Sequence, residues 1–232
     1  MVLVTGGTGL VGSHLLLKLA EQGVRVRAIH RDESDLSRVE KIFSYYTDQA
    51  STLFEKIEWF PADINNIPDL EKAFDSILQV YHCAALISFD PRDYELLHKT
   101  NVEGTANIVN LCIANSIEKL CYVSSIAAIG KSIGGQVATE ENEWSHPHPS
   151  VYSITKTAAE LEVWRGSQEN VPVVVINPGV IIGPGFWQTG SGTLFQRASR
   201  APKYFPPGGS GFVTVSDVVT IMTTLMKSDI QN

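Results

Sequence analysis

Hydrophobic and polar positions at the start of the chain predict a strand, a helix and a second strand. Residues 1 to 5 form an apolar, β-branched run. A glycine-rich turn separates them from residues 10 to 20, whose apolar positions have helical spacing and stop before Gly23. Residues 24 to 29 then alternate as a second strand. Two strands joined by a helix within about 30 residues form a crossover unit and pair in parallel.

The same alternation continues through the middle of the chain. Residues 35 to 54 are charged and aromatic and predict one or two helices. Further strands are predicted at 57–60, 78–85, 120–125 and 171–176, and helices are predicted after Pro68, over about 92–114 and around Tyr152. Strands that alternate with helices indicate an α/β fold with a doubly wound parallel sheet, whose ligands bind beyond the carboxyl ends of the strands.

Beyond the sixth strand the pattern changes to a loop-rich region, with Gly/Pro or Gly/Ser clusters at 183–185 and 190–192. A last short strand is predicted at 212–215, followed by a helix over about 217–227 with Ser216 as its N-cap. This region is expected to serve a purpose other than nucleotide binding.

Composition narrows the class of protein. The 232 residues suffice for a full core, and the net charge of −7 without a Lys/Arg-rich run argues against a nucleic-acid surface. There is no basic leader and no apolar run of membrane-spanning length, so we expect a cytoplasmic protein without membrane contact. The three cysteines lack ligand spacing, and His146 and His148 have no third ligand nearby, so no metal site is predicted.

The turn at residues 5–12 has glycines at positions 6, 9 and 12. Glycine lets the backbone approach a pyrophosphate closely, and free N–H groups at the following helix N-terminus attract the anion. Such a triplet is also found in purely structural turns, but its place between a first strand and a first helix indicates a dinucleotide site. No Gly-Lys-Ser/Thr follows, which excludes a Walker-type phosphate loop.

The second strand ends at His30-Arg31-Asp32, where the adenosine ribose of a dinucleotide is expected. A basic residue at this place pairs with the 2′-phosphate of NADP, whereas an acid accepts from the ribose hydroxyls of NAD. Arg31 favours NADP, and Asp32 keeps NAD open. The alternative is a solvated loop in which neither residue contacts a cofactor.

Tyr152 and Lys156 are four residues apart and therefore lie on one face if the segment is helical. A nearby ammonium favours the phenolate and is expected to lower the pKa of Tyr152 from its usual value of about 10, which makes the phenol a usable acid and base. The spacing is common by chance, and two unrelated residues on an amphipathic helix are the alternative.

Several short segments, in this order, resemble the short-chain dehydrogenase/reductase superfamily. They are the Thr-Gly-x-x-Gly-x-x-Gly loop at 5–12, Asp63-Ile64, His82-Cys83-Ala84-Ala85, Asn101-Val102-Glu103-Gly104-Thr105, Ser124-Ser125, Tyr152-Ser153-Ile154-Thr155-Lys156, Asn177-Pro178 and Gly183-Pro184. The glycine loop, the 101–105 segment and the Gly-Pro turn are similar to its extended branch of NAD-dependent epimerases and dehydratases and dihydroflavonol-reductase-like enzymes. The resemblance implies a Rossmann fold with a small substrate-binding lobe near the C-terminus.

The resemblance implies catalytic roles for three residues. Tyr152 would exchange a proton with the substrate oxygen during hydride transfer, and Lys156 would bind the nicotinamide ribose and lower the pKa of Tyr152. Ser125 would hold the substrate oxygen beside the phenol, with Ser124 as the alternative. Either serine hydroxyl has a plainer use in satisfying local backbone, and Asn101 would anchor the active-site strands or only join a helix to a strand.

A cofactor site is implied by the same resemblance. Asp63 and Ile64 would lie at the adenine ring, Ala84 and Ala85 would leave room for the cofactor, and Pro178 would flank the nicotinamide. The full set of expected cofactor-binding residues is Gly6, Thr8, Gly9, Leu10, Val11, Gly12, Arg31, Asp63, Ile64, Ala84, Ala85, Lys156 and Pro178.

Residues 1–178 are thus expected to form a dinucleotide-binding domain. Residues 179–232 are expected to form part of a substrate-binding region, with a returning strand and helix. Extended members of the superfamily usually continue past the strand that resembles 212–215, so we expect an incomplete lobe and a chain truncated at its C-terminal end.

Three functions remain open. The leading hypothesis is an NADP-dependent reductase or dehydrogenase that acts on a carbonyl or a secondary alcohol of a small molecule. An epimerase or dehydratase of sugar nucleotides with tightly held NAD would use the same residues, and a non-catalytic dinucleotide sensor is the third possibility. A homodimer through the Tyr152 helix and the long helix before the fifth strand is implied by the resemblance alone.

Overall fold

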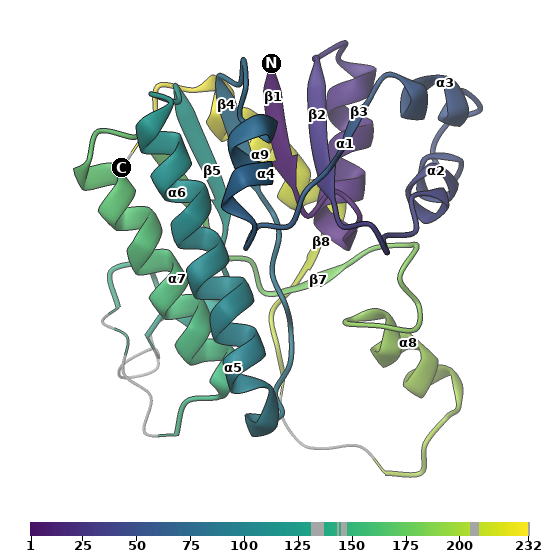
Figure 1. Cartoon of the computed structure of the whole chain (residues 1–232). Helices are drawn as coiled ribbons and strands as arrows, with labels where there is room; N and C mark the ends of the chain where they lie inside the picture. Colours follow the sequence, from purple (N-terminus) through teal and green to yellow (C-terminus); the bar gives the residue numbers. More distant parts are fainter. Residues whose placement is uncertain (131–136, 143, 145–147, 205–208, 232) are drawn as a thin grey trace.

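The computed structural model describes residues 1–130, 137–142, 144, 148–204 and 209–231. Its main sheet, within these residues, has six parallel strands in the order β3-β2-β1-β4-β5-β6 (Figure 1). The strands are β1 (Val2–Thr5), β2 (Val26–His30), β3 (Glu58–Pro61), β4 (Gln79–His82), β5 (Lys119–Val123) and β6 (Val173–Ile176). The strand order reverses between β1 and β4, and the predicted doubly wound parallel sheet is confirmed.

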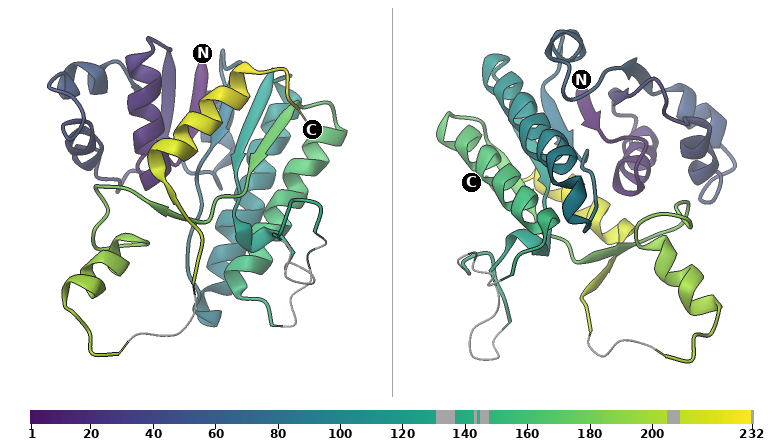
Figure 2. Two further views of the ribbon diagram at one scale, coloured as in Figure 1. Left: turned by 180° about the vertical axis from the view of Figure 1, so that it is seen from behind. Right: turned by 60° about the horizontal axis from the view of Figure 1, so that its bottom comes forward.

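Helices cover both faces of this sheet (Figures 1 and 2). One face carries α1 (Leu10–Glu21) and α9 (Val215–Lys227), with α2 (Ser37–Phe43) and α3 (Ala50–Glu55) packed beside α1. The other face carries α4 (Ile67–Ala73), α6 (Gly104–Ala114) and α7 (Val151–Gln168). Most strand residues are apolar, and successive side chains along a strand enter the two cores in turn.

The register of the sheet also aligns buried polar residues at its carboxyl edge. Thr5 of β1 pairs with His82 of β4, and His82 pairs with Tyr122 of β5. Paired residues project to the same face, so these three side chains form a row beneath α6 and α7.

The helix expected over 92–114 is interrupted. A 3₁₀ turn (Pro91–Asp93) and α5 (Tyr94–Leu97) precede a π-helical turn, η2 (His98–Glu103), before α6 begins. Within the π turn, the Asn101 side chain accepts from the Leu86 N–H (2.8 Å) and donates to the Leu86 carbonyl (3.0 Å). A π turn holds one more residue than an α-turn, and here it places Asn101 against the loop after β4.

Beyond β6 the chain forms a separate pair of parallel strands, β7 (Val180–Ile182) and β8 (Phe212–Thr214), and a helix, α8 (Gly192–Ser199). They lie beyond the carboxyl ends of the main strands (Figures 1 and 2). The short strand β7 and the helix α8 lie in a region that the sequence predicts to be rich in loops.

The N-cap of α9 differs from the prediction. Thr214, not Ser216, accepts a hydrogen bond from the Asp217 N–H, at 3.1 Å. An N-cap side chain reaches the N–H group two or three residues ahead, and Ser216 already lies within the helix.

None of the helices in the described residues is long and apolar enough to cross a membrane.

Candidate active site

The glycine turn connects β1 to α1. Gly6 has φ of +68°, and a Cβ there would lie 2.6 Å from the Ala84 nitrogen. A Cβ on Gly12 would lie 2.1 Å from the Gly6 carbonyl oxygen, so α1 packs directly on the turn. In the described part of the chain, no side chain caps α1, whose N-cap is Gly9. The turn and first helical turn, which include Thr8, Leu10 and Val11, therefore present N–H groups that suit an anion.

Tyr152 lies in the first turn of α7, where Ser150 caps the helix by accepting from the Ser153 N–H (3.1 Å). Its side chain is buried and interacts with the side chain of Ser125, which follows β5. Burial raises the pKa of Tyr152, and the interaction with Ser125 opposes the rise. The expected lowering of this pKa by Lys156 is therefore wrong for the chain alone, because the ammonium is directed to other groups.

Lys156 lies one turn further along α7 and is only 1% exposed. Its Nζ donates to the Tyr122 hydroxyl (2.6 Å) and to the Val123 carbonyl (3.0 Å) of β5. Burial lowers the pKa of Lys156 to about 7, and the negative charge of Glu160 opposes this shift. The lysine can consequently change protonation state near neutral pH.

The two serines after β5 face different partners. Buried Ser124 donates to Glu160 Oε2 at 2.5 Å, and the Asn177 amide donates to the same oxygen at 2.9 Å. Ser124 therefore joins β5 to α7. Ser125 accepts from the Ala127 N–H (3.1 Å), which is the local backbone bond expected of such a serine, and its side chain also interacts with that of Tyr152. Of the two, Ser125 is the serine that reaches the phenol.

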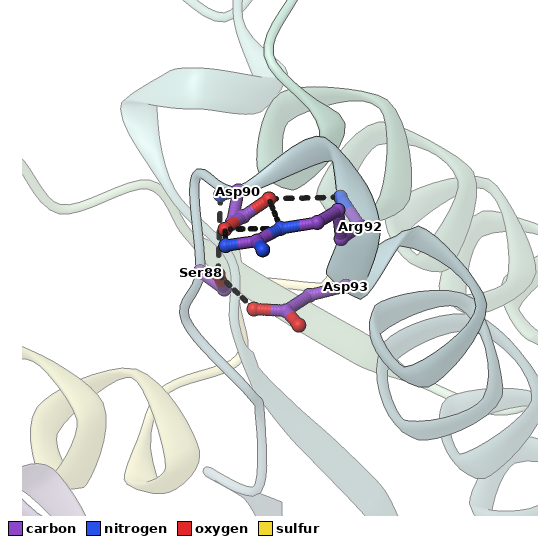
Figure 3. A network of polar contacts seen from close by, with 4 residues as sticks. All are labelled: Ser88, Asp90, Arg92 and Asp93. Carbon is purple, nitrogen blue, oxygen red and sulfur yellow. Dashed lines mark hydrogen bonds and ion pairs between the residues drawn. The ribbon is translucent and has the colours of Figure 1, made fainter.

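An aromatic ring lies against Tyr152 from the loop after β4. The Phe89 and Tyr152 rings meet edge to face with centroids 5.5 Å apart, yet Phe89 is 67% exposed. A tight polar turn supports this loop: Arg92 binds Asp90 through Nε (3.0 Å) and Nη2 (2.5 Å), and Ser88 donates to Asp93 (2.6 Å) (Figure 3). Phe89 is thereby held beside the phenol with most of its surface open.

A pocket of about 460 Å³ lies at the ends of β2 and β3. It is lined by Arg31, Asp32, Glu33, Pro61, Ala62, Asp63, Asn66 and Asp69. Arg31 and Glu33 form an exposed ion pair at 3.2 Å, and Asp63 accepts from the Asn65 N–H at 2.8 Å. Two of the expected cofactor residues, Arg31 and Asp63, thus line one pocket.

The remaining expected cofactor residues are distributed along the carboxyl edge. Ile64 is buried, and its side chain packs on Gly104, where a Cβ would lie 2.5 Å from Ile64 Cδ1. Ala84 follows β4 and donates to Thr5 Oγ1 (3.2 Å), beside exposed Ala85. The Pro178 carbonyl accepts from the Ile126 N–H at 3.1 Å.

Sequence patterns do not reveal two contacts made by the site. Glu160, four residues after Lys156, accepts hydrogen bonds from Ser124 and Asn177. In the sequence, its helical spacing from Lys156 is the signal that could have indicated its place in the site. Tyr122 has no such signal, because its contact with Lys156 depends on how α7 packs on the sheet. In the residues that the structure describes, no cluster of three metal-ligating side chains is found; His146 lies outside them.

Comparisons with known proteins agree with this architecture. The model of the NAD dependent epimerase/dehydratase family matches residues 2–231. A dihydroflavonol 4-reductase-like protein of Synechocystis sp. is 33% identical to this chain over 225 residues. The matched region covers 93% of this chain and 60% of the Synechocystis protein. Cinnamoyl-CoA reductase CAD2 of Medicago truncatula is 30% identical over 236 residues, covering 94% of this chain and 69% of that protein.

Among solved structures, the Bordetella bronchiseptica enzyme WbmG in complex with NAD and UDP has a TM-score of 0.77 at 23% identity. The match covers 98% of this chain and 69% of that one, and it concerns the fold. The chain spans about three fifths of the length of the Synechocystis relative. Because the family model matches nearly all residues of the chain, the chain belongs to the NAD-dependent epimerase/dehydratase family.

Proposed function

We propose that the protein is an NADP-dependent reductase or dehydrogenase that interconverts a carbonyl and a secondary alcohol on a small molecule. The observation that carries the proposal is the convergence of Ser125, Tyr152 and Lys156 at the carboxyl edge of the sheet, next to the glycine turn. Relatives named for dihydroflavonol and cinnamoyl-CoA reduction support a net redox reaction.

The residues of the turn fit a dinucleotide. A Cβ at position 12 would lie 2.1 Å from the Gly6 carbonyl oxygen, so only glycine fits at position 12. The start of α1 has no side-chain cap, which leaves its N–H groups available for the pyrophosphate. Gly6, Thr8, Gly9, Leu10, Val11 and Gly12 would hold it, with Asp63 and Ile64 near the adenine and Ala84, Ala85 and Pro178 along the remaining edge. When bound, the nicotinamide supplies or accepts the hydride.

The three catalytic residues act on the substrate oxygen. Ser125, whose side chain interacts with Tyr152, would hold that oxygen beside the phenol, and Tyr152 would donate a proton to it on reduction or remove one on oxidation. Lys156, whose pKa is about 7, would bind the nicotinamide ribose and place its positive charge near the phenol. A raised Tyr152 pKa favours the protonated phenol, which is the form that reduction needs.

Arg31 supports NADP over NAD. Its guanidinium is exposed and borders the pocket at the end of β2, and it pairs there with Glu33. A 2′-phosphate offers two or three charge-assisted hydrogen bonds in place of that exposed ion pair, which itself contributes little. Asp32 lines the same pocket and is the residue that would serve NAD.

A titration of the protein with NADP and with NAD tests the cofactor first, and an assay with reduced cofactor and carbonyl substrates then tests Tyr152→Phe. We expect tighter NADP binding, and loss of turnover in the variant with an unchanged cofactor Kd. Purified protein that retains NAD and gives no net change in nicotinamide absorbance with substrate would point to the epimerase or dehydratase. If Tyr152→Phe keeps both cofactor binding and biological activity, both enzymatic functions are excluded and the non-catalytic sensor remains.

The domain division and the assembly are further parts of the proposal. Residues 1–178 would hold the cofactor and 179–232 part of the substrate site, although α9 itself packs with α1 in the main core. Leu161 is 64% exposed on α7, which supports a homodimer through α6 and α7. A monomer in light scattering at micromolar concentration would exclude that dimer. A cytoplasmic location fits a protein that uses this cofactor pool.

A further inference from the structure

A buried chain of polar groups runs across the sheet from the glycine turn to Lys156. The Ala84 N–H donates to Thr5 Oγ1 (3.2 Å), and Thr5 Oγ1 lies 2.6 Å from His82 Nδ1. His82 Nε2 lies 2.9 Å from Thr105 Oγ1, the Thr105 side chain interacts with the Tyr122 hydroxyl, and that hydroxyl receives Lys156 Nζ at 2.6 Å. Thr5, His82, Thr105, Tyr122 and Lys156 are each at most 1% exposed.

The direction of these hydrogen bonds follows from Lys156. An ammonium only donates, so the Tyr122 oxygen accepts from Lys156 and its own hydrogen is free for Thr105. Thr105 can then donate to His82 Nε2, which leaves Nδ1–H to donate to Thr5. His82 is neutral in this arrangement, in agreement with burial, which lowers the pKa of His82 to about 3.

The geometry fixes the Tyr122 oxygen in position. Its ring stacks on His82 with centroids 5.5 Å apart, and Lys156 Nζ lies 4.3 Å from the Tyr122 ring centroid. The hydroxyl and the electron-rich face of one residue therefore both contact the same ammonium. In a site where burial disfavours the charge on Lys156, Tyr122 supplies compensation.

We propose that Tyr122 is a positioning residue that keeps the Lys156 side chain ammonium in place, and that the Thr105–His82–Thr5 chain holds Tyr122 in register with the glycine turn. The inference rests on the proposed catalytic role of Lys156. It assigns to Tyr122, two residues before Ser124, a function separate from those of Ser125 and Tyr152.

The charged and titratable groups around Lys156 come from three elements. Glu160 and Tyr152 belong to α7, Cys83 and His82 belong to the end of β4, and Tyr122 belongs to β5. Glu160 favours the ammonium, whereas burial opposes it and lowers the pKa of Lys156 to about 7. The ammonium form of Lys156 donates a stronger hydrogen bond to the Tyr122 hydroxyl than the neutral amine does, so removal of that hydroxyl should lower the pKa of Lys156 further.

The test compares Tyr122→Phe with Tyr81→Phe. Tyr81 is also buried, one residue before His82 on β4, but its side chain enters the opposite core. Lysine labelled with ¹⁵N at Nζ gives an NMR signal for Lys156, assigned through Lys156→Met, that reports ionisation without catalysis. We expect its midpoint to fall by about one pH unit in Tyr122→Phe, because a hydrogen bond to a charged group is lost, and to stay in place in Tyr81→Phe.

Thr105→Val supplies a second test that keeps the side-chain volume. It should shift the same midpoint in the same direction, by less, because Tyr122 remains but loses its partner. An unmoved Lys156 midpoint in both variants would overturn the proposal. A wild-type protein without carbonyl reduction, but with the NMR shift, would instead refute only the proposed function.

Discussion

On the proposed assignment, single residues at the end of β2 would set the choice between NADP and NAD. Arg31→Ala should raise the Kd for NADP by about tenfold or more, since a charge-assisted contact is lost, and should leave the Kd for NAD nearly unchanged. Glu33→Gln is the matched variant. It frees Arg31 from the 3.2 Å ion pair and should strengthen NADP binding. Equal effects of Arg31→Ala on both cofactors, measured by fluorescence titration, would contradict an NADP-selective pocket.

For single residues, the sequence identifies the chemical groups of the site but not their pKa values or hydrogen-bond partners. Ser125, Tyr152 and Lys156 are recognisable from their motifs, and the structure brings all three to one edge. The expected lowering of the Tyr152 pKa fails because helical spacing places Lys156 on the same face without directing its ammonium. Packing against β5 directs it instead to Tyr122 and Val123.

Among the elements, the loop between β4 and the π turn is built to hold Phe89 against Tyr152. Phe89→Ala should raise the substrate KM by about 2- to 10-fold, because an aromatic contact beside the phenol is lost, without changing the cofactor Kd. Ile87, 60% exposed in the same loop, provides the control Ile87→Ala. Initial-rate kinetics should leave that control near the wild type. An equal loss in both variants would mean that the loop as a whole, and not the Phe89 ring, matters.

The elements that sequence patterns miss are those whose signal is too short or too subtle. A six-residue π turn alters the phase of a helix by one residue, which the apolar spacing of 92–114 does not resolve. The three residues of β7 lie among glycines and prolines, and pairing with β8 supplies the order that their own pattern lacks. The strands of the main sheet are by contrast plain in the sequence, above all β1 and β6 with their β-branched runs.

Across the whole molecule, Lys119 connects the sheet to the last helix. Its buried ammonium donates to the Leu225 carbonyl (2.7 Å) and the Ser228 carbonyl (2.8 Å), at the C-terminal end of α9. Lys119→Met should lower the free energy of unfolding by about 1.5–3 kcal/mol, since hydrogen bonds from a charged group are lost and carbonyls of a helix end lose their partner. Lys227→Met, which removes only the exposed contact with Gln22, should change it little in urea unfolding.

The packing of α1 against α9 has a consequence for how the protein is made. Both helices fill the same core, although almost the whole described sequence separates them. While the ribosome is still producing the middle of the chain, the sheet face beside α1 has no cover, and its apolar side chains are open to other nascent chains and to chaperones. Closure comes late and depends on contacts between residues far apart in sequence, which are slow to form. Among the described elements, α9 is the last to be synthesised, so this core is completed only after all the other described helices and strands have been made.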